Sequence, residues 1–120
     1  MSVAKVFSDL IRAGDPNSIA AACMLCPKSV LEQGSKLADD EGVFKRIEIL
    51  QDLSIFATHK YIIVPGKYCS CHFYQENVVK RRISWTCKHD LGVRLRVALR
   101  GSQSIDLDIN GNETLLKFLV

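Results

Sequence analysis

Four residues in the second half of the chain have the types and spacing of a zinc-binding set. Cys69 and Cys71 are separated by one residue, and Cys87 and His89 are separated in the same way further along. Three thiolates and one imidazole complete the tetrahedral coordination of Zn2+. A catalytic zinc keeps one position open for water, so this closed set argues against hydrolytic chemistry at the metal. We therefore expect one structural zinc ion and no enzymatic activity.

The spacing also indicates which elements must hold the ligands. Residues i and i+2 of an extended strand point to the same face, so Cys69 and Cys71 can reach one ion from a strand end. Cys87 and His89 stand where a helix is expected to begin, and the positive end of a helix favours thiolate over thiol. Chance clustering is the weaker explanation, because the chain has only five cysteines and three histidines.

The remaining cysteines and histidines do not suggest a second site. Cys23 and Cys26 have the spacing of half a zinc site, but no further pair is left to complete it. At helical spacing we expect them to be small buried hydrophobic residues, and the sequence leaves their role open. His72 is expected on the surface, and His59 in a turn between two strands.

A second possible cation site lacks the ligand that its last position requires. Asp106, Asp108, Asn110 and Gly111 resemble the start of a calcium-binding loop, but the twelfth position is Lys117, where a bidentate glutamate is required. We expect a turn there instead. The sequence also has no glycine-rich phosphate loop, so any ATP binding must come from a partner.

The residue pattern around these positions predicts an α+β fold with N-terminal helices and a short antiparallel β meander. Apolar residues at helical spacing predict a helix from Val3 to Ile11, which the turn residues from Gly14 to Pro16 end. A second helix is expected from a cap at Ser18 to Cys26, and a third over 29–37. Residues 1–42 should thus form a helical N-terminal part.

β-branched and aromatic residues replace the helical pattern in the middle of the chain. Three short runs predict antiparallel strands at 43–50, 53–58 and 61–64. The turn residues Pro65 and Gly66 then lead directly into the first ligand pair. Residues 43–101 should hold this meander and the zinc module.

The chain after Cys87 returns to helical spacing, and Gly101 is expected to end that helix. The final part, 102–120, predicts a turn at 110–112 and a short apolar helix over 114–120. Those terminal apolar residues either complete the core or are covered by a partner, and the sequence leaves both open.

The length and composition of the chain indicate a single folded domain. With 120 residues, 48% hydrophobic and 24% charged, the chain fits one folded domain over 1–120. Its longest apolar run is much shorter than the roughly 20 residues needed to cross a bilayer, so we expect no membrane span, and no secretory signal is recognisable. Cysteines in such a chain are expected to stay reduced and to bind metal.

Basic residues gather in the same region as the ligands. The net charge is only +3, but cations dominate positions 80 to 100. Such clustering can attract a nucleic-acid backbone, or it can be a solvated face beside an anionic metal site. Under the first interpretation the candidate contacts are Lys80, Arg81, Arg82, Arg94 and Arg96.

A family resemblance narrows these alternatives. Cys-x-Cys, a variable gap and Cys-x-His opening a helix resemble the SWIM zinc finger, a ββα module. The flanks "KYCSCHFY" and "TCKHDLGVRL" resemble the small stand-alone SWIM proteins of the Shu complex, from about Tyr61 to the C-terminus. One departure is Gly92, where the family motif usually carries alanine.

The resemblance implies a nuclear, non-enzymatic subunit with one structural zinc. Such proteins partner RecA-like recombinase paralogues and promote homologous recombination by assisting recombinase filaments on single-stranded DNA, which they contact directly or through the partner. Two other functions remain open from the residues: an independent nucleic-acid-binding zinc module, and a general protein-interaction adaptor.

Overall fold

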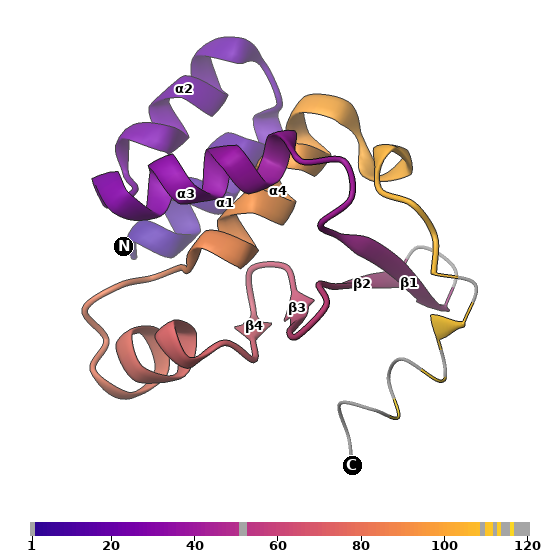
Figure 1. Ribbon diagram of the computed structural model, residues 1–120. Helices are drawn as coiled ribbons and strands as arrows, with labels where there is room; N and C mark the ends of the chain where they lie inside the picture. The colour runs from indigo at the N-terminus through magenta and orange to yellow at the C-terminus, as the bar shows by residue number, and fades with distance from the viewer. Residues whose placement is uncertain (1, 51–52, 109, 112, 114–115, 117–120) are drawn as a thin grey trace.

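The computed structural model describes the chain except residues 1, 51–52, 109, 112, 114–115 and 117–120, and it confirms the predicted α+β architecture. The N-terminal part contains α1 (Val3–Ala13), α2 (Pro16–Met24) and α3 (Lys28–Asp39), which gather on one side of the molecule (Figure 1). The second helix begins earlier than its expected cap at Ser18. Asp15 is the cap instead, because its carboxylate accepts hydrogen bonds from both the amide and the hydroxyl of Ser18.

A four-stranded antiparallel sheet follows in the simple order β1-β2-β3-β4. The strands are short and consecutive in the chain, as a meander requires, and the predicted runs each give one strand. Their bounds are β1 (Lys45–Leu50), β2 (Leu53–Ala57), β3 (Ile62–Val64) and β4 (Tyr68–Cys69). Ile63 pairs with Cys69 across the last hairpin, so the sheet ends at the first ligand pair.

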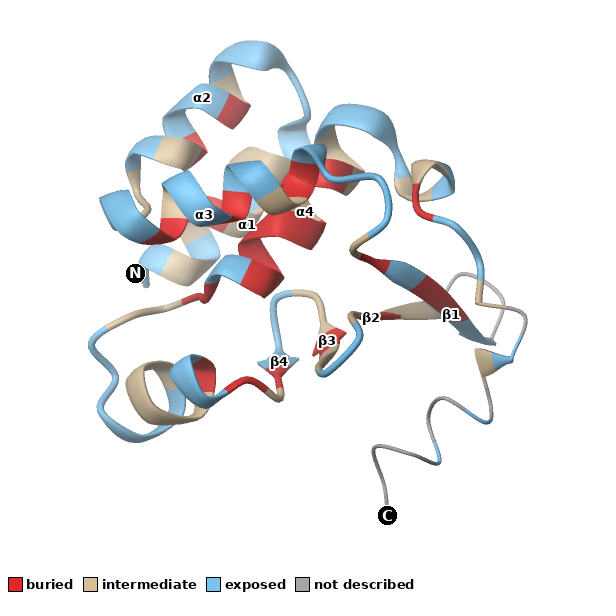
Figure 2. Ribbon diagram, in the orientation of Figure 1, coloured by how far each residue is buried: buried red, intermediate tan, exposed pale blue. Residues whose placement is uncertain are grey.

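Helix α4 (Lys88–Arg100) joins the two halves of the molecule. Figure 2 shows that its first half is mostly buried, and the helix packs against α1 and α3. Leu91 and Leu95 face the apolar cluster of the N-terminal helices, whereas Val93 faces the cluster under the sheet. A single helix therefore connects the helical core to the core that contains Cys69, Cys71 and Cys87.

The π-helix between the two ligand pairs was not predicted. Residues between the two ligand pairs form a π-helix, η1 (Tyr74–Lys80), rather than an irregular gap. The amide of Arg81 donates to the carbonyl of Glu76 at 3.0 Å, which is the i to i+5 bond of that helix type. So short a segment shows no apolar period, and its wide helical turn leaves no signature in the residue pattern.

The end of the chain contributes less to the site. A short 3-10 helix, η2 (Ser102–Ser104), follows α4, and Leu107 forms an isolated bridge with Arg46. The predicted helix over 114–120 falls almost entirely outside the described residues, as does Lys117 of the calcium-like pattern. Within the described part, no helix is both long and apolar enough to span a membrane.

Candidate metal centre

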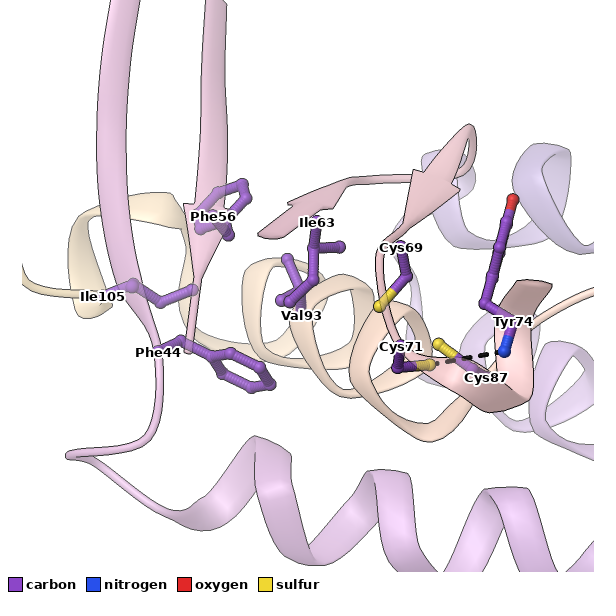
Figure 3. Close-up of a cluster of buried hydrophobic side chains, with 9 residues drawn as sticks. All are labelled: Phe44, Phe56, Ile63, Cys69, Cys71, Tyr74, Cys87, Val93 and Ile105. Carbon is purple, nitrogen blue, oxygen red and sulfur yellow. Dashed lines mark hydrogen bonds between the residues drawn. The ribbon is translucent and has the colours of Figure 1, made fainter. Parts of the chain in front are cut away.

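All four predicted ligands meet in one buried cluster. Cys69 ends β4, Cys71 precedes η1, Cys87 caps α4 and His89 lies in its first turn. The three sulfur atoms and one imidazole nitrogen all lie within 4.8 Å of one another. Figure 3 shows the three cysteine side chains pointing into a common space between the β3–β4 hairpin and the start of α4.

The dimensions of this cluster suit one tetrahedral metal ion. Ligands of tetrahedral zinc, at Zn–S about 2.3 Å and Zn–N about 2.0 Å, are separated by roughly 3.5 to 3.8 Å. The sulfur of Cys69 lies 3.9 Å from Nδ1 of His89, close to that separation. All four residues are buried, so an ion here is shielded from competing water. The structure thus holds a Cys3His cluster compatible with one bound ion.

Backbone amides support two of the sulfurs. The amide of Tyr74 donates to Sγ of Cys71, and the amide of Asp90 donates to Sγ of Cys87, each at 3.4 Å. Such hydrogen bonds stabilise thiolate and fix its direction. The hydrogen bond from the amide of Asp90 to Cys87 is also the N-cap of α4, so Cys87 both begins the helix and offers its sulfur as a ligand.

Hydrogen bonds among the three thiols shift their pKa values in opposite directions. Hydrogen bonds from the thiols of Cys69 and Cys87 lower the pKa of Cys71 strongly. Donating to Cys71 raises the pKa of Cys69 to about 12, and hydrogen bonds to Cys69 and Cys71 raise that of Cys87. These opposite shifts favour thiolate at Cys71 and thiol at Cys69 and Cys87. A divalent ion would replace the two remaining protons.

A buried carboxylate that sequence inspection overlooked holds the two ligand-bearing segments together. Asp90 is 1% exposed and accepts hydrogen bonds from the amide of Gly66 at 2.8 Å and the hydroxyl of Thr86 at 2.7 Å. Gly66 belongs to the β3–β4 turn, 24 residues away in the chain. Asp90 therefore ties the start of α4 to the hairpin that carries Cys69.

The same carboxylate is paired with Arg94, whose Nη2 lies 2.7 Å from Oδ2 of Asp90. The guanidinium also donates to the hydroxyl of Ser8 and stands 5.0 Å from the ring centroid of Phe7, both on α1. The polar contacts thus run from the metal centre to the first helix, through a guanidinium packed on an aromatic ring.

Tyr61 is a second neighbour that the sequence did not single out. Its ring centroid lies 4.7 Å from that of His89, with the planes tilted by 47°. Packing against Tyr61 restricts rotation of the imidazole and so fixes the direction of its nitrogen atoms.

Two of the five basic residues proposed for nucleic-acid contact make their hydrogen bonds inside the protein. Arg94 is occupied by Asp90 and Ser8, as described above. Arg96 is 5% exposed and donates to the carbonyl oxygens of Ala38 and Ser104. Both guanidinium groups tie elements together inside the protein, because helical spacing turned these positions inward. Lys80, Arg81 and Arg82 are exposed.

The other cysteines and histidines lie outside the metal cluster, and Cys23 and Cys26 are less buried than the sequence predicts. Cys23 and Cys26 are half-buried beside the helical core and take no part in the metal cluster. Burial raises the pKa of Cys26 to about 12, so its thiol stays protonated and behaves as a small apolar group. His59 and His72 are exposed.

Comparison with known proteins adds no family. No protein-family model, no curated protein and no solved structure matches this chain. The function proposed for the chain therefore rests on the residues and geometry of the metal centre.

Proposed function

We propose that the protein is a non-enzymatic subunit that holds one structural Zn2+ through Cys69, Cys71, Cys87 and His89. The observation that carries this proposal is the buried Cys3His cluster with ligand atoms within 4.8 Å of one another. Zinc is the ion proposed because three thiolates and one imidazole are its usual structural ligands. With four protein ligands, no coordination position remains for an activated water.

The role proposed for such an ion is to fix the shape of the molecule. Cys69 and Cys71 come from the end of the hairpin, whereas Cys87 and His89 come from α4, so an ion would join two segments separated by η1. Binding free energy at a site of this kind is also folding free energy. A surface built on the hairpin and the start of α4 would then depend on the metal.

We further propose that this surface serves a nuclear Shu-type complex. In that role the protein partners a RecA-like recombinase paralogue and promotes homologous recombination through the assembly or stability of recombinase filaments. The support is the spacing of the ligand pairs and the flanking residues, which resemble stand-alone SWIM proteins. Contact with single-stranded DNA, direct or through the partner, belongs to the same proposal.

One specific observation favours a second candidate, an independent nucleic-acid-binding module. Lys80, Arg81 and Arg82 are consecutive and exposed at the end of η1. Of the three side chains, that of Lys80 lies 3.7 Å from Glu76, a weak exposed pair. Such a basic run can bind phosphates, with an affinity that falls as salt rises.

The test compares two variants of the full chain. His89→Ala removes a ligand, and the Arg81→Gln, Arg82→Gln double variant removes exposed charge without touching the centre. Zinc content, co-purification of a RecA-like partner from nuclear extract, and single-stranded DNA binding over a salt series are measured for both. The subunit proposal expects the histidine variant to lose zinc and partner, and the arginine variant to keep both.

Two results would contradict the subunit proposal. One is a histidine variant that retains the partner after losing its zinc. The other is tight, salt-sensitive DNA binding by the isolated protein that the double variant abolishes, which would favour the independent module.

A further inference from the structure

Two surface hollows meet beside the metal centre. One, of about 280 Å3, lies between the start of α3 and the segment 71–73, and the other, of about 400 Å3, lies between the end of α3 and the β2–β3 turn. Tyr61, Lys88 and His89 line both of them. The two hollows are therefore neighbours along α3, and we call them together the α3 groove.

The charged side chains that line the α3 groove, apart from the metal ligands, are basic. Lys88 stands where the two hollows meet, and Lys60 lines the larger one. Imidazoles of His72 and His59 line the smaller and the larger hollow respectively. Among the described lining residues there is no carboxylate. The groove therefore favours an occupant with negative charge.

Three acidic side chains near the groove pair with arginines. Asp39 and Glu41, at the end of α3, lie 3.8 and 3.9 Å from the guanidinium of Arg100, and Asp90 is buried against Arg94. A zinc ion with three thiolates carries a net charge of minus one, which offsets only one of the two lysines. The lining lysines and the proposed ion together thus keep a positive surplus.

Apolar walls surround these cations on both sides. Val30 and Phe73 line the smaller hollow, and Leu37 and Val43 line the larger one. Phe73 is 42% exposed although it is a large apolar side chain. The pattern along the groove is therefore apolar, then cationic at Lys88, then apolar.

We propose that the α3 groove binds a partner's peptide segment in which an acidic side chain lies between two apolar side chains. The two hollows receive the apolar side chains, and Lys88 pairs with the carboxylate between them. A nucleic-acid strand fits less well, because its regularly spaced phosphates need a row of cations, and the exposed run at 80–82 does not line the groove. This inference rests on the proposed role as a partner-binding subunit.

The metal centre forms one wall of this groove. Cys71, Cys87 and His89 all line the smaller hollow. Loss of the ion would therefore deform the groove as well as the centre, which links partner binding to zinc through one shared surface.

The experiment selects phage-displayed random short peptides on the zinc-loaded full-length protein. The strongest peptide is then synthesised, and its affinity is measured by fluorescence anisotropy for Lys88→Glu, Lys60→Glu and the matched control Lys36→Glu. Lys36 is exposed on α3 and lines neither hollow. Glutamate at the first position of α4 suits the helix dipole, so the Lys88 variant is expected to fold, and its zinc content is checked.

The proposal expects selected peptides with an acidic residue flanked by apolar ones. It expects at least about tenfold weaker binding for Lys88→Glu, a smaller loss for Lys60→Glu, and none for Lys36→Glu. A peptide whose acidic residue is changed to lysine should regain affinity for the Lys88 variant.

Selected peptides without acidic residues, or equal affinity of the Lys88 and Lys36 variants, would overturn the proposal. Oligothymidylate binding with the same dependence on Lys88 would overturn it in favour of nucleic acid. If the protein keeps its zinc, either result contradicts only the peptide-binding proposal and not the proposed structural zinc. A folded protein that contains no zinc contradicts the proposed function itself.

Discussion

The backbone amide of Asp90 lies 3.4 Å from the sulfur of Cys87, and this contact caps the first turn of α4. The carboxylate of Asp90 meanwhile accepts the amide of Gly66 from the β3–β4 turn. One residue thus orients a candidate ligand through its main chain and holds the opposite ligand-bearing segment through its side chain.

The first prediction follows from this arrangement. Asp90→Asn removes the negative charge that faces Arg94, whose side chain is only 10% exposed. Leaving a buried cation without its partner costs about 3 kcal/mol. The free energy of unfolding of the zinc-loaded protein, measured by chemical denaturation, should fall by about that amount.

Asp39→Asn is the matched control for this change. Asp39 also lies near an arginine, but its side chain is 80% exposed and the distance to Arg100 is 3.8 Å. Exposed pairs contribute well under about 1 kcal/mol. Equal losses for the two variants would mean that Asp90 has no special part in the centre.

The second prediction concerns the candidate ligands. Cys87→Ser and His89→Ala should each reduce bound zinc from about one ion per chain to a small fraction, and should unfold the C-terminal half, because the ion joins hairpin and helix. Elemental analysis and far-UV circular dichroism measure these effects. Cys23→Ser should leave zinc content unchanged, and comparable zinc loss from that variant would show that the ligands are misassigned.

The third prediction concerns protons released by metal binding. The pKa of Cys69 is raised to about 12 and that of Cys87 is also raised, whereas that of Cys71 is lowered. Near neutral pH two thiols thus lose a proton when zinc binds, so zinc affinity should fall as pH falls, because protons compete for the same sulfurs. Calorimetry in buffers of different ionisation enthalpy should report about two protons per ion, and release of three would contradict the lowered pKa of Cys71.

The fourth prediction explains the glycine at position 92. A Cβ there would lie 3.1 Å from Cβ of Leu37, 3.1 Å from Cζ of Phe44 and 3.2 Å from the carbonyl oxygen of Gly34. Alanine would gain about 1 kcal/mol of helix propensity, but overpacking costs about 1 to 3 kcal/mol. Gly92→Ala should therefore lower the thermal midpoint by a few degrees.

Gly42→Ala adds the same methyl group where it meets only Oδ1 of Asp40, at 3.8 Å. That variant should leave the thermal midpoint nearly unchanged. A stabilised Gly92→Ala protein would mean that α3 and α4 can separate slightly at no cost.

The residue pattern alone determined the four candidate ligands and the main elements. Cys69, Cys71, Cys87 and His89 were identifiable because metal ligands are few in type and come in short pairs. Helices and strands were identifiable because burial of one face repeats at a fixed period along the chain. These signals are local, so they survive without knowledge of the fold.

Only the tertiary structure decided which polar groups support the centre. The contact of Asp90 with Gly66 spans 24 residues, and that of Arg94 with Ser8 spans 86. No period in the sequence encodes such pairs, so Arg94 and Arg96 looked like exposed cations although both are held inside. The physical reason is that hydrogen bonds over long chain separations depend on how α4 packs against the hairpin and the N-terminal helices, and that packing exists only once the whole chain has folded.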